Sequence, residues 1–396
     1  MTMDRARVVY VTYDGLCDHI AQSQVLPYTL GAARGGWPMT IISHEKPTRT
    51  GAEIARVADL LAEESVDWIR LPYLASRPTQ ALPFHLAAEI GALVRRIGRQ
   101  RRVILHARSY IPAVATAAVG AALGIPWIFD IRGFWFDEKV DAGRTAGRAY
   151  RIAKRAEREL LRRADAIVSL TDAARVPMQE WVGTLEFAGK ISVIPTCVDL
   201  ARFTPPATPQ HDWPLRIGYV GSFGPRYLLD EMVRVFAAIK RQRSDAHFRV
   251  VTRSEVSSLH EACGRAGLAP EAYSTVSVDH VGVVDELRAM HATLSLVEPG
   301  RASAASCPTK FGESLATGCP VVVNPGVGDC ADIVRCHGIG VVHDAGRDPA
   351  MTASELLRLL SDPAHAGRCR AVAVERFSVD WAIDRYDEIY ARLATR

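Results

Sequence analysis

The chain has 396 residues, and 48% of them are apolar. That length is more than one domain usually needs and is enough for two domains with a core each. The formal net charge is only +4, so bulk charge does not favour a nucleic-acid partner. The eight cysteines include no CxxC pair, which predicts reduced thiols in a cytoplasmic protein. No apolar run is long enough to suggest a membrane-spanning helix.

Arginine is concentrated in two stretches of the first half, residues 95–102 and 144–163. Both are predicted helices, and the simpler interpretation is a solvated helix face. The alternative is a basic patch that faces anionic phospholipid. In that case the protein would be peripheral on the inner face of the membrane.

Short apolar runs alternate with helical patterns along the chain, which is typical of parallel sheets covered by helices. Strands are predicted at 7–12, 37–43, 66–71, 103–106, 126–130, 166–170, 191–194, 215–220, 248–252, 276–281, 293–297, 321–323 and 338–342. The helix after the first strand is expected to begin near Ser23.

Residues 206–214, rich in proline and threonine, interrupt this alternation and predict a linker. We therefore expect an α/β protein with two doubly wound domains, 1–205 and 215–378. A final helix, 379–396, is expected to pack back toward the first domain. Ligands of such sheets bind at the carboxyl ends of the strands, here in a cleft between the domains.

The stretch 306–329 places a cation, a carboxylate and a predicted helix N-terminus close together in sequence. Pro308 suits the first turn of a helix, and Gly318 suits the position just after its end. Lys310 and Glu313 are three residues apart, so they share one face of that helix. A cation, a carboxylate and a helix N-terminus at one place are suited to binding a diphosphate and a ribose.

Six motifs occur in the order and spacing of one family. They are YDG at 13–15 with QSQVLPY at 22–28, HARSY at 106–110, DIRGFW at 130–135, VIPTCVDLARF at 193–203, GYVGSFG at 218–224 and PTKFGESLATGCPVV at 308–322. With them the chain resembles the GT-B glycosyltransferases of family 4, a retaining group that uses nucleotide-sugar donors. The resemblance implies two Rossmann-like domains facing across a cleft. It also implies transfer of a sugar from a UDP- or GDP-linked donor to a hydroxyl acceptor, in the synthesis of surface polysaccharide, glycolipid or glycoconjugate.

The resemblance implies that the second domain binds the donor. Glu313 would accept hydrogen bonds from the ribose hydroxyls, and Lys310 would contact the diphosphate, where negative charge builds as the leaving group departs. The simpler alternative is an ion pair between these two on a helix surface. The other expected donor contacts are Gly221, Ser222, Gly224, Arg226, Arg253, Pro308, Thr309 and Phe311.

In the first domain, His106 is expected at the end of a strand and near the reacting carbon of the sugar. It is predicted to be catalytic together with Lys310 and Glu313, although a lone histidine at a strand end is often a structural hydrogen-bonding residue. The aromatic residues 134–136 could bind the acceptor or plug the core. The expected acceptor contacts are Asp14, Gly15, Arg108, Ser109, Arg132 and Trp135.

One departure from the family pattern stands out. Glu313 matches the second of two paired glutamates, but Ala305 occupies the place of the first, whose role is assigned to no residue. No Asp-x-Asp and no metal-ligand spacing occurs, so we expect no metal and no other cofactor. Two alternatives stay open: a nucleotide-sugar epimerase on the same fold, with Asp130 as the one candidate acid, and a non-catalytic nucleotide-sugar-binding subunit.

Overall fold

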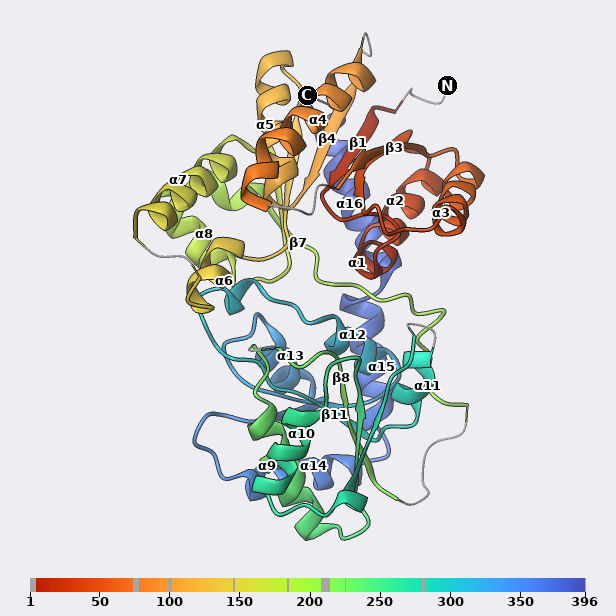
Figure 1. Ribbon diagram of the computed structural model, residues 1–396, viewed down its shortest axis with the longest axis vertical. Coiled ribbons are helices and arrows are strands. Elements are labelled where there is room, and N and C mark those ends of the chain that lie inside the picture. The colour runs from red at the N-terminus through yellow and green to blue at the C-terminus, as the bar shows by residue number, and fades with distance from the viewer. Residues whose placement is uncertain are drawn as a thin grey trace. The chain divides into compact units, whose positions relative to one another are not determined.

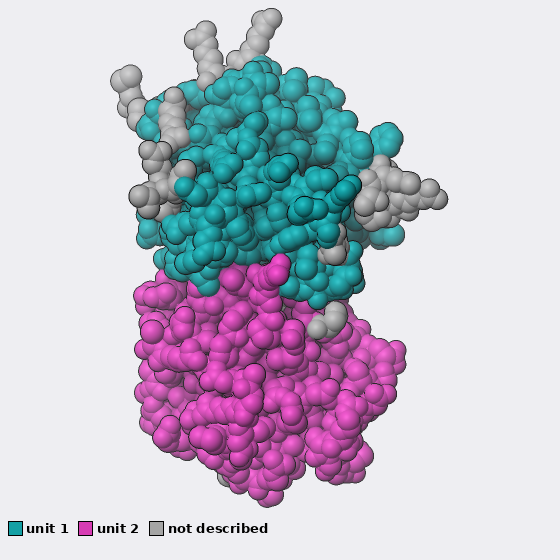
Figure 2. Space-filling model, turned by 90° about the vertical axis from the view of Figure 1, so that its left-hand side faces the viewer, with its two compact units in different colours: residues 1–195, 379–396 teal, residues 196–378 magenta. Residues whose placement is uncertain are grey.

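The computed structural model describes residues 5–73, 78–98, 102–144, 147–183, 185–207, 214–224, 226–279 and 282–395. Its contacts divide the chain into two compact units, which Figure 2 colours separately. Unit 1 comprises Met1–Pro195 and Val379–Arg396, and unit 2 comprises Thr196–Ser378. Each unit is a parallel sheet with helices packed against it (Figure 1), so the expected pair of Rossmann-like folds is confirmed.

Unit 1 is built on a seven-stranded parallel sheet. In spatial order its strands are β3 (Asp67–Pro72), β2 (Met39–Glu45), β1 (Arg7–Thr12), β4 (Val103–Arg108), β5 (Trp127–Ile131), β6 (Ala166–Ser169) and β7 (Ile191–Val193). The strands β1, β4 and β5 are buried almost throughout, as expected for central strands covered on both faces. Their carboxyl ends, at Thr12, Arg108 and Ile131, lie side by side and set the place of a site in this unit.

The helices of unit 1 follow the strands in alternation. They are α1 (His19–Gln24), α2 (Leu26–Arg34), α3 (Gly51–Glu63), α4 (Pro78–Ile97), α5 (Tyr110–Leu123), α6 (Trp135–Asp141), α7 (Gly147–Arg163), α8 (Arg175–Val182) and α16 (Val379–Ala394), with the 3-10 turn η1 (Leu185–Lys190). The last helix, α16, packs against α2 and β4 (Figure 1). Trp37 Nε1 donates a hydrogen bond to Asp387 of α16 at 2.7 Å.

Unit 2 is built on a six-stranded parallel sheet. In spatial order its strands are β10 (Tyr273–Val276), β9 (His247–Val251), β8 (Arg216–Val220), β11 (Ala292–Ser295), β12 (Val321–Val323) and β13 (Gly340–Val342). Its helices are α9 (Leu229–Gln242), α10 (Ser257–Arg265), α11 (Gly282–Arg288), α12 (Thr309–Ala316), α13 (Cys330–His337), α14 (Pro349–Leu360) and α15 (His365–Arg376), with 3-10 turns η2 (Pro270–Ala272) and η3 (Ser303–Ala305). One core joins the sheet to α9, α10 and α14, and a second joins it to α11, α12, α13 and α15.

Two expected elements differ from the structure. The strand expected at 276–281 is β10 at Tyr273–Val276, because its parallel partner β9 ends at Val251, opposite Val276. The helix expected from Ser23 is two helices that meet at Val25, because Pro27 lies in the first turn of α2 and lacks the N–H that a continuous helix needs. At the end of α12, Gly318 has a φ of +79°, so its predicted place after the helix is confirmed.

The residues just before the predicted linker belong to unit 2. Val198 donates a backbone hydrogen bond to the Phe377 carbonyl at 2.6 Å, and both Val198 and Phe203 are buried in the second core of that unit. Most of the predicted linker, 206–214, lies outside the described residues.

Candidate functional site

The turn between β8 and α9 lies directly against the amine of Lys310. Gly221 has a φ of +145°, and a Cβ at this position would lie 2.5 Å from Lys310 Nζ. The Nζ atom is buried and has no hydrogen-bond partner in the described part of the chain. It lies 4.0 Å from the ring centroid of Tyr227 and 4.6 Å from that of Tyr219. A glycine is therefore required at 221, and the lysine is enclosed by ring faces and backbone.

Burial shifts the acid–base equilibria of Lys310 and Glu313 in opposite directions. It lowers the pKa of Lys310 to about 7, and the neighbouring Glu313 offsets only part of this shift. It raises the pKa of Glu313 to about 7, against the opposing effects of Lys310 and Arg202. Both side chains are on α12, one turn apart. Burial has already desolvated Lys310 and Glu313, so binding an anion or a hydroxyl to them would remove little further water.

The remaining expected donor residues are placed unequally. Arg226 Nη2 donates to Ser306 Oγ at 2.9 Å, so it joins the turn after β8 to the loop before α12. Arg253 is exposed and donates to the Val278 carbonyl. Pro308 is the N-cap of α12 and Thr309 its first residue, both partly exposed. Phe311 is wrong as a donor contact, because its side chain is fully buried in the core against Phe377.

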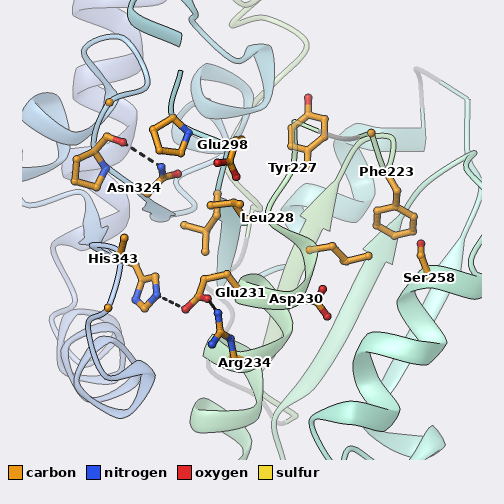
Figure 3. Close-up of a pocket in the computed structure, with 18 of the residues that line it drawn as sticks. Phe223, Tyr227, Leu228, Asp230, Glu231, Arg234, Ser258, Glu298, Asn324 and His343 are labelled. Carbon is orange, nitrogen blue, oxygen red and sulfur yellow. Dashed lines mark hydrogen bonds and ion pairs between the residues drawn. The ribbon is translucent and has the colours of Figure 1, made fainter. Parts of the chain in front are cut away.

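A cavity of about 1000 Å³ opens at the carboxyl edge of the same sheet (Figure 3). Loops after β8, β11, β12 and β13, the start of α9 and one face of α10 surround it. Phe223 and Gly224 of the predicted turn line this cavity, whereas Lys310 and Glu313 do not. The sequence analysis missed the other lining residues, among them Tyr227, Glu298, Asn324 and His343. Glu298 did carry a signal, since it directly follows the apolar run that contains β11.

In unit 1, a buried carboxylate holds the loop that carries Gly15. Glu45 Oε1 accepts a hydrogen bond from Leu16 N at 2.6 Å and another from Ser43 Oγ at 2.8 Å. A Cβ at Gly15 would lie 2.8 Å from both Glu45 Oε2 and the His44 carbonyl oxygen. The loop is therefore fixed tightly to β2, and only glycine fits at 15. The sequence analysis did not identify Glu45.

Arg108 stands at the carboxyl end of β4, beside that loop. Its residue surface is 5% exposed, and Nε lies 3.4 Å from Asp14 Oδ2. Its Nη1 atom is buried and finds no hydrogen-bond partner in the ranges that the structure describes. Ser109, next in the chain, has a φ of +71°, a strained conformation for a non-glycine residue. Backbone strain of this kind is common at functional sites.

His106 is not at the end of its strand, and the structure corrects this expectation. The strand continues to Arg108, and His106 has no exposed surface. Its Nδ1 lies 2.8 Å from Tyr390 Oη of α16, and its ring packs on Tyr10. Burial lowers its pKa, although Asp130 acts in the opposite direction. In this structure His106 is an interior hydrogen-bonding residue, and its predicted catalytic role stays a prediction.

Asp130 and Arg132 form an interior ion pair in unit 1. Arg132 Nη1 lies 3.3 Å from Asp130 Oδ1, and Tyr386 Oη donates to Asp130 Oδ2 at 3.3 Å. Burial alone would raise the pKa of Asp130, but Arg132 and His106 outweigh it and hold that pKa well below its usual range. Arg132 is thus paired with a buried carboxylate beside α16, and its predicted contact with the acceptor stays a prediction.

The aromatic residues 134–136 divide between core and surface. Phe134 is fully buried against Trp181, with 4.6 Å between ring centroids, whereas Trp135 is 41% exposed. Lys139 Nζ lies 3.5 Å from the Trp135 ring centroid. Phe134 is thus a core residue, and Trp135 stays available for the predicted acceptor contact.

The described residues contain no cluster of three or more His, Cys, Asp or Glu side chains placed to hold a metal ion. Nor does any helix within the described ranges have the length and hydropathy needed to cross a bilayer.

Comparison with known families resolves the class of protein. Residues 21–197 match the glycosyl transferase 4-like domain, and residues 214–362 match glycosyl transferases group 1. The two matches together span most of the chain. The chain is a glycosyltransferase.

Solved structures show the fold of this glycosyltransferase. A glycosyltransferase from Rickettsia africae is similar with a TM-score of 0.71 at 14% identity, covering 99% of each chain. Sucrose-phosphate synthase from Thermosynechococcus elongatus gives 0.70 at 14% identity, covering 98% of this chain and 99% of the other. HepE from Anabaena, in complex with UDP, gives 0.69 at 14% identity, covering 98% and 100%. These neighbours confirm the predicted GT-B fold, and a comparison with curated proteins found no match.

Proposed function

We propose that this glycosyltransferase uses a nucleotide-diphosphate sugar, UDP- or GDP-linked, and transfers the sugar to a hydroxyl acceptor with retention of configuration. The observation that carries the proposal is the amine of Lys310, buried without a hydrogen-bond partner among the described residues and enclosed by the Gly221 turn. A buried amine of this kind gains much from an anionic ligand. The Anabaena neighbour was solved with UDP and also with UDP-glucose, which supports the same donor class.

In this proposal the chemistry of unit 2 is electrostatic. Negative charge grows on the bridging oxygen as the nucleoside diphosphate leaves, and a protonated Lys310 would stabilise that charge more than the ground state. Glu313 would accept hydrogen bonds from the ribose. The acceptor hydroxyl would attack from the face that the leaving group vacates, and the departing phosphate would help take its proton. No metal ion enters this scheme.

Thermal shift tests the donor. UDP, GDP, ADP, CMP and dTDP, each with its common sugars, are added to the protein in EDTA and then with Mg²⁺. A ligand that binds only the folded state raises the midpoint. We expect one nucleotide diphosphate to do so without metal, and Glu313→Gln to abolish the shift. Glu271→Gln, an exposed carboxylate of η2 in the same unit, is the matched control. No shift from any nucleotide in folded protein would contradict the proposal.

Turnover separates the remaining alternatives. Transfer to a hydroxyl acceptor, with the product anomer assigned by NMR, would support the retaining enzyme, and an inverted anomer would refute retention. Donor binding without transfer to any lipid-linked, polymeric or small hydroxyl acceptor would favour the binding subunit. No observation favours an epimerase, because Asp130, its candidate acid, is buried and already paired.

Contact with the inner face of a membrane is a further part of the proposal. Arg148, Arg151 and Arg155 are exposed on α7, and Ile152 between them is 70% exposed. Basic and apolar side chains together suit an anionic bilayer surface. Co-sedimentation with vesicles containing phosphatidylglycerol should be lost at high salt and weakened in a variant with Arg151→Glu and Arg155→Glu. Failure to sediment at low salt would refute membrane contact.

A further inference from the structure

The cavity of unit 2 contains one carboxylate that is not engaged. Glu298 projects into it near Tyr227 (Figure 3). The Glu298 side chain is exposed and makes no hydrogen bond or ion pair with a described residue, whereas the other carboxylates of the lining are paired. Asp230 pairs with Arg265 at 2.6 Å, and Glu231 pairs with both Arg234 and His343. Glu298 is therefore the acceptor that the cavity offers to a ligand.

The backbone fixes Glu298 from both sides. Its N–H donates to the Arg226 carbonyl at 2.7 Å, and its carbonyl accepts from Ser303 Oγ at 2.9 Å. Tyr227 and Val297 form an antiparallel bridge immediately beside it. The backbone that carries the exposed Glu298 side chain is thus held at a defined place on the cavity wall.

The lining of the cavity disfavours a phosphate and suits a sugar. Its lining has four carboxylates, those of Asp230, Glu231, Glu261 and Glu298, against two arginines, so the cavity wall is negatively charged and would repel a phosphate beside Glu298. The rings of Phe223 and Tyr227 and the side chain of Leu228 supply flat apolar surface. A carboxylate accepts from two neighbouring hydroxyls, and such surface packs on the C–H groups of a pyranose.

We propose that this cavity binds a neutral sugar ring, with Glu298 accepting hydrogen bonds from two of its hydroxyls. A volume of about 1000 Å³ is ample for one or two rings. The sugar could come from the nucleotide-linked donor or from a saccharide acceptor, and both present the same hydroxyls. The donor source rests on the proposed function. The acceptor source does not require UDP to bind.

Calorimetry on the full chain tests the proposal, with UDP and UDP-glucose as one pair of probes and free glucose and maltose as the other. The variants are Glu298→Gln, which keeps shape and removes the charge, and Glu271→Gln as control. If the donor sugar occupies the cavity, Glu298→Gln should weaken UDP-glucose binding about tenfold to a hundredfold and change UDP binding less than about twofold. If the acceptor sugar occupies the cavity, Glu298→Gln should weaken the binding of free glucose and maltose by the same factor.

The outcomes separate the two proposals. If UDP does not bind the wild type, that result counts against the donor assignment alone, because binding of the free saccharides still tests the cavity. Equal weakening of UDP and UDP-glucose by Glu298→Gln would show that Glu298 acts on the nucleotide part, and would overturn the sugar assignment. Unchanged binding of every probe in folded Glu298→Gln would overturn it as well.

Discussion

Replacing Lys310 with methionine should make the ligand-free protein more stable while removing donor binding. Burial moves the pKa of this amine from 10.5 to about 7, which corresponds to about 4 kcal/mol of destabilisation at pH 7. The faces of Tyr219 and Tyr227 offset about 2 kcal/mol of this as cation–π contacts. Methionine fills a similar volume without the charge, so the net gain should be about 2 kcal/mol. For a unit of this size, that is a rise in Tm of roughly 4–8 °C.

The pH dependence gives a second readout. Because the folded pKa is lowered, the unfolded chain binds more protons between pH 7 and 10.5, and the stability of the wild type rises with pH across that window. The advantage of Lys310→Met should therefore be full below pH 7 and shrink as the pH approaches 10.5.

The assay is differential scanning fluorimetry from pH 6 to 10, with and without the nucleotide diphosphate that stabilises the wild type. Lys46→Met, at a partly exposed lysine that pairs with Asp18, is the control and should change Tm little. A ligand-free Lys310→Met protein that is less stable than the wild type, or one that keeps the full ligand-induced shift, would refute the reasoning.

Two further substitutions test the geometry. Gly221→Ala places a Cβ 2.5 Å from Lys310 Nζ at a φ of +145°, so we expect the free energy of unfolding in urea to fall by about 2–4 kcal/mol and the nucleotide-induced rise in Tm to be lost. Gly264→Ala in α10, where nothing lies within 4 Å of the added Cβ, is the control and should be tolerated. A fully stable Gly221→Ala protein would show that the turn is not as tight as described. Arg132→Met leaves Asp130 buried without its partner and raises the pKa of that carboxyl, so it should lower the free energy of unfolding by about 3–5 kcal/mol. The control Arg385→Met, at an exposed pair with Glu388, should lower it by only about 0–1 kcal/mol. Equal effects of the two substitutions would contradict a structural role for the interior pair.

Much of this protein could be predicted from local sequence, because its decisive signals are local. Apolar runs alternating with amphipathic stretches specify strands and helices, and Gly318 marks the end of α12 because few other residues adopt its φ. The spacing of Lys310 and Glu313 places them on one helix, whatever surrounds it. Where the signal was weaker, the prediction failed: the extent of β10 depends on the length of its partner β9.

Only the tertiary structure decided the surroundings of each side chain. His106 is buried because α16, nearly 300 residues later, places Tyr390 beside it, so Arg108 and not His106 occupies the end of β4. The amine of Lys310 is enclosed because the turn after β8 passes over it, and the cavity with Glu298 exists because loops from four strands converge. The burial and charge pairing of a side chain depend on residues distant in sequence. They are therefore set by tertiary packing and cannot be predicted from the spacing of residues along the chain.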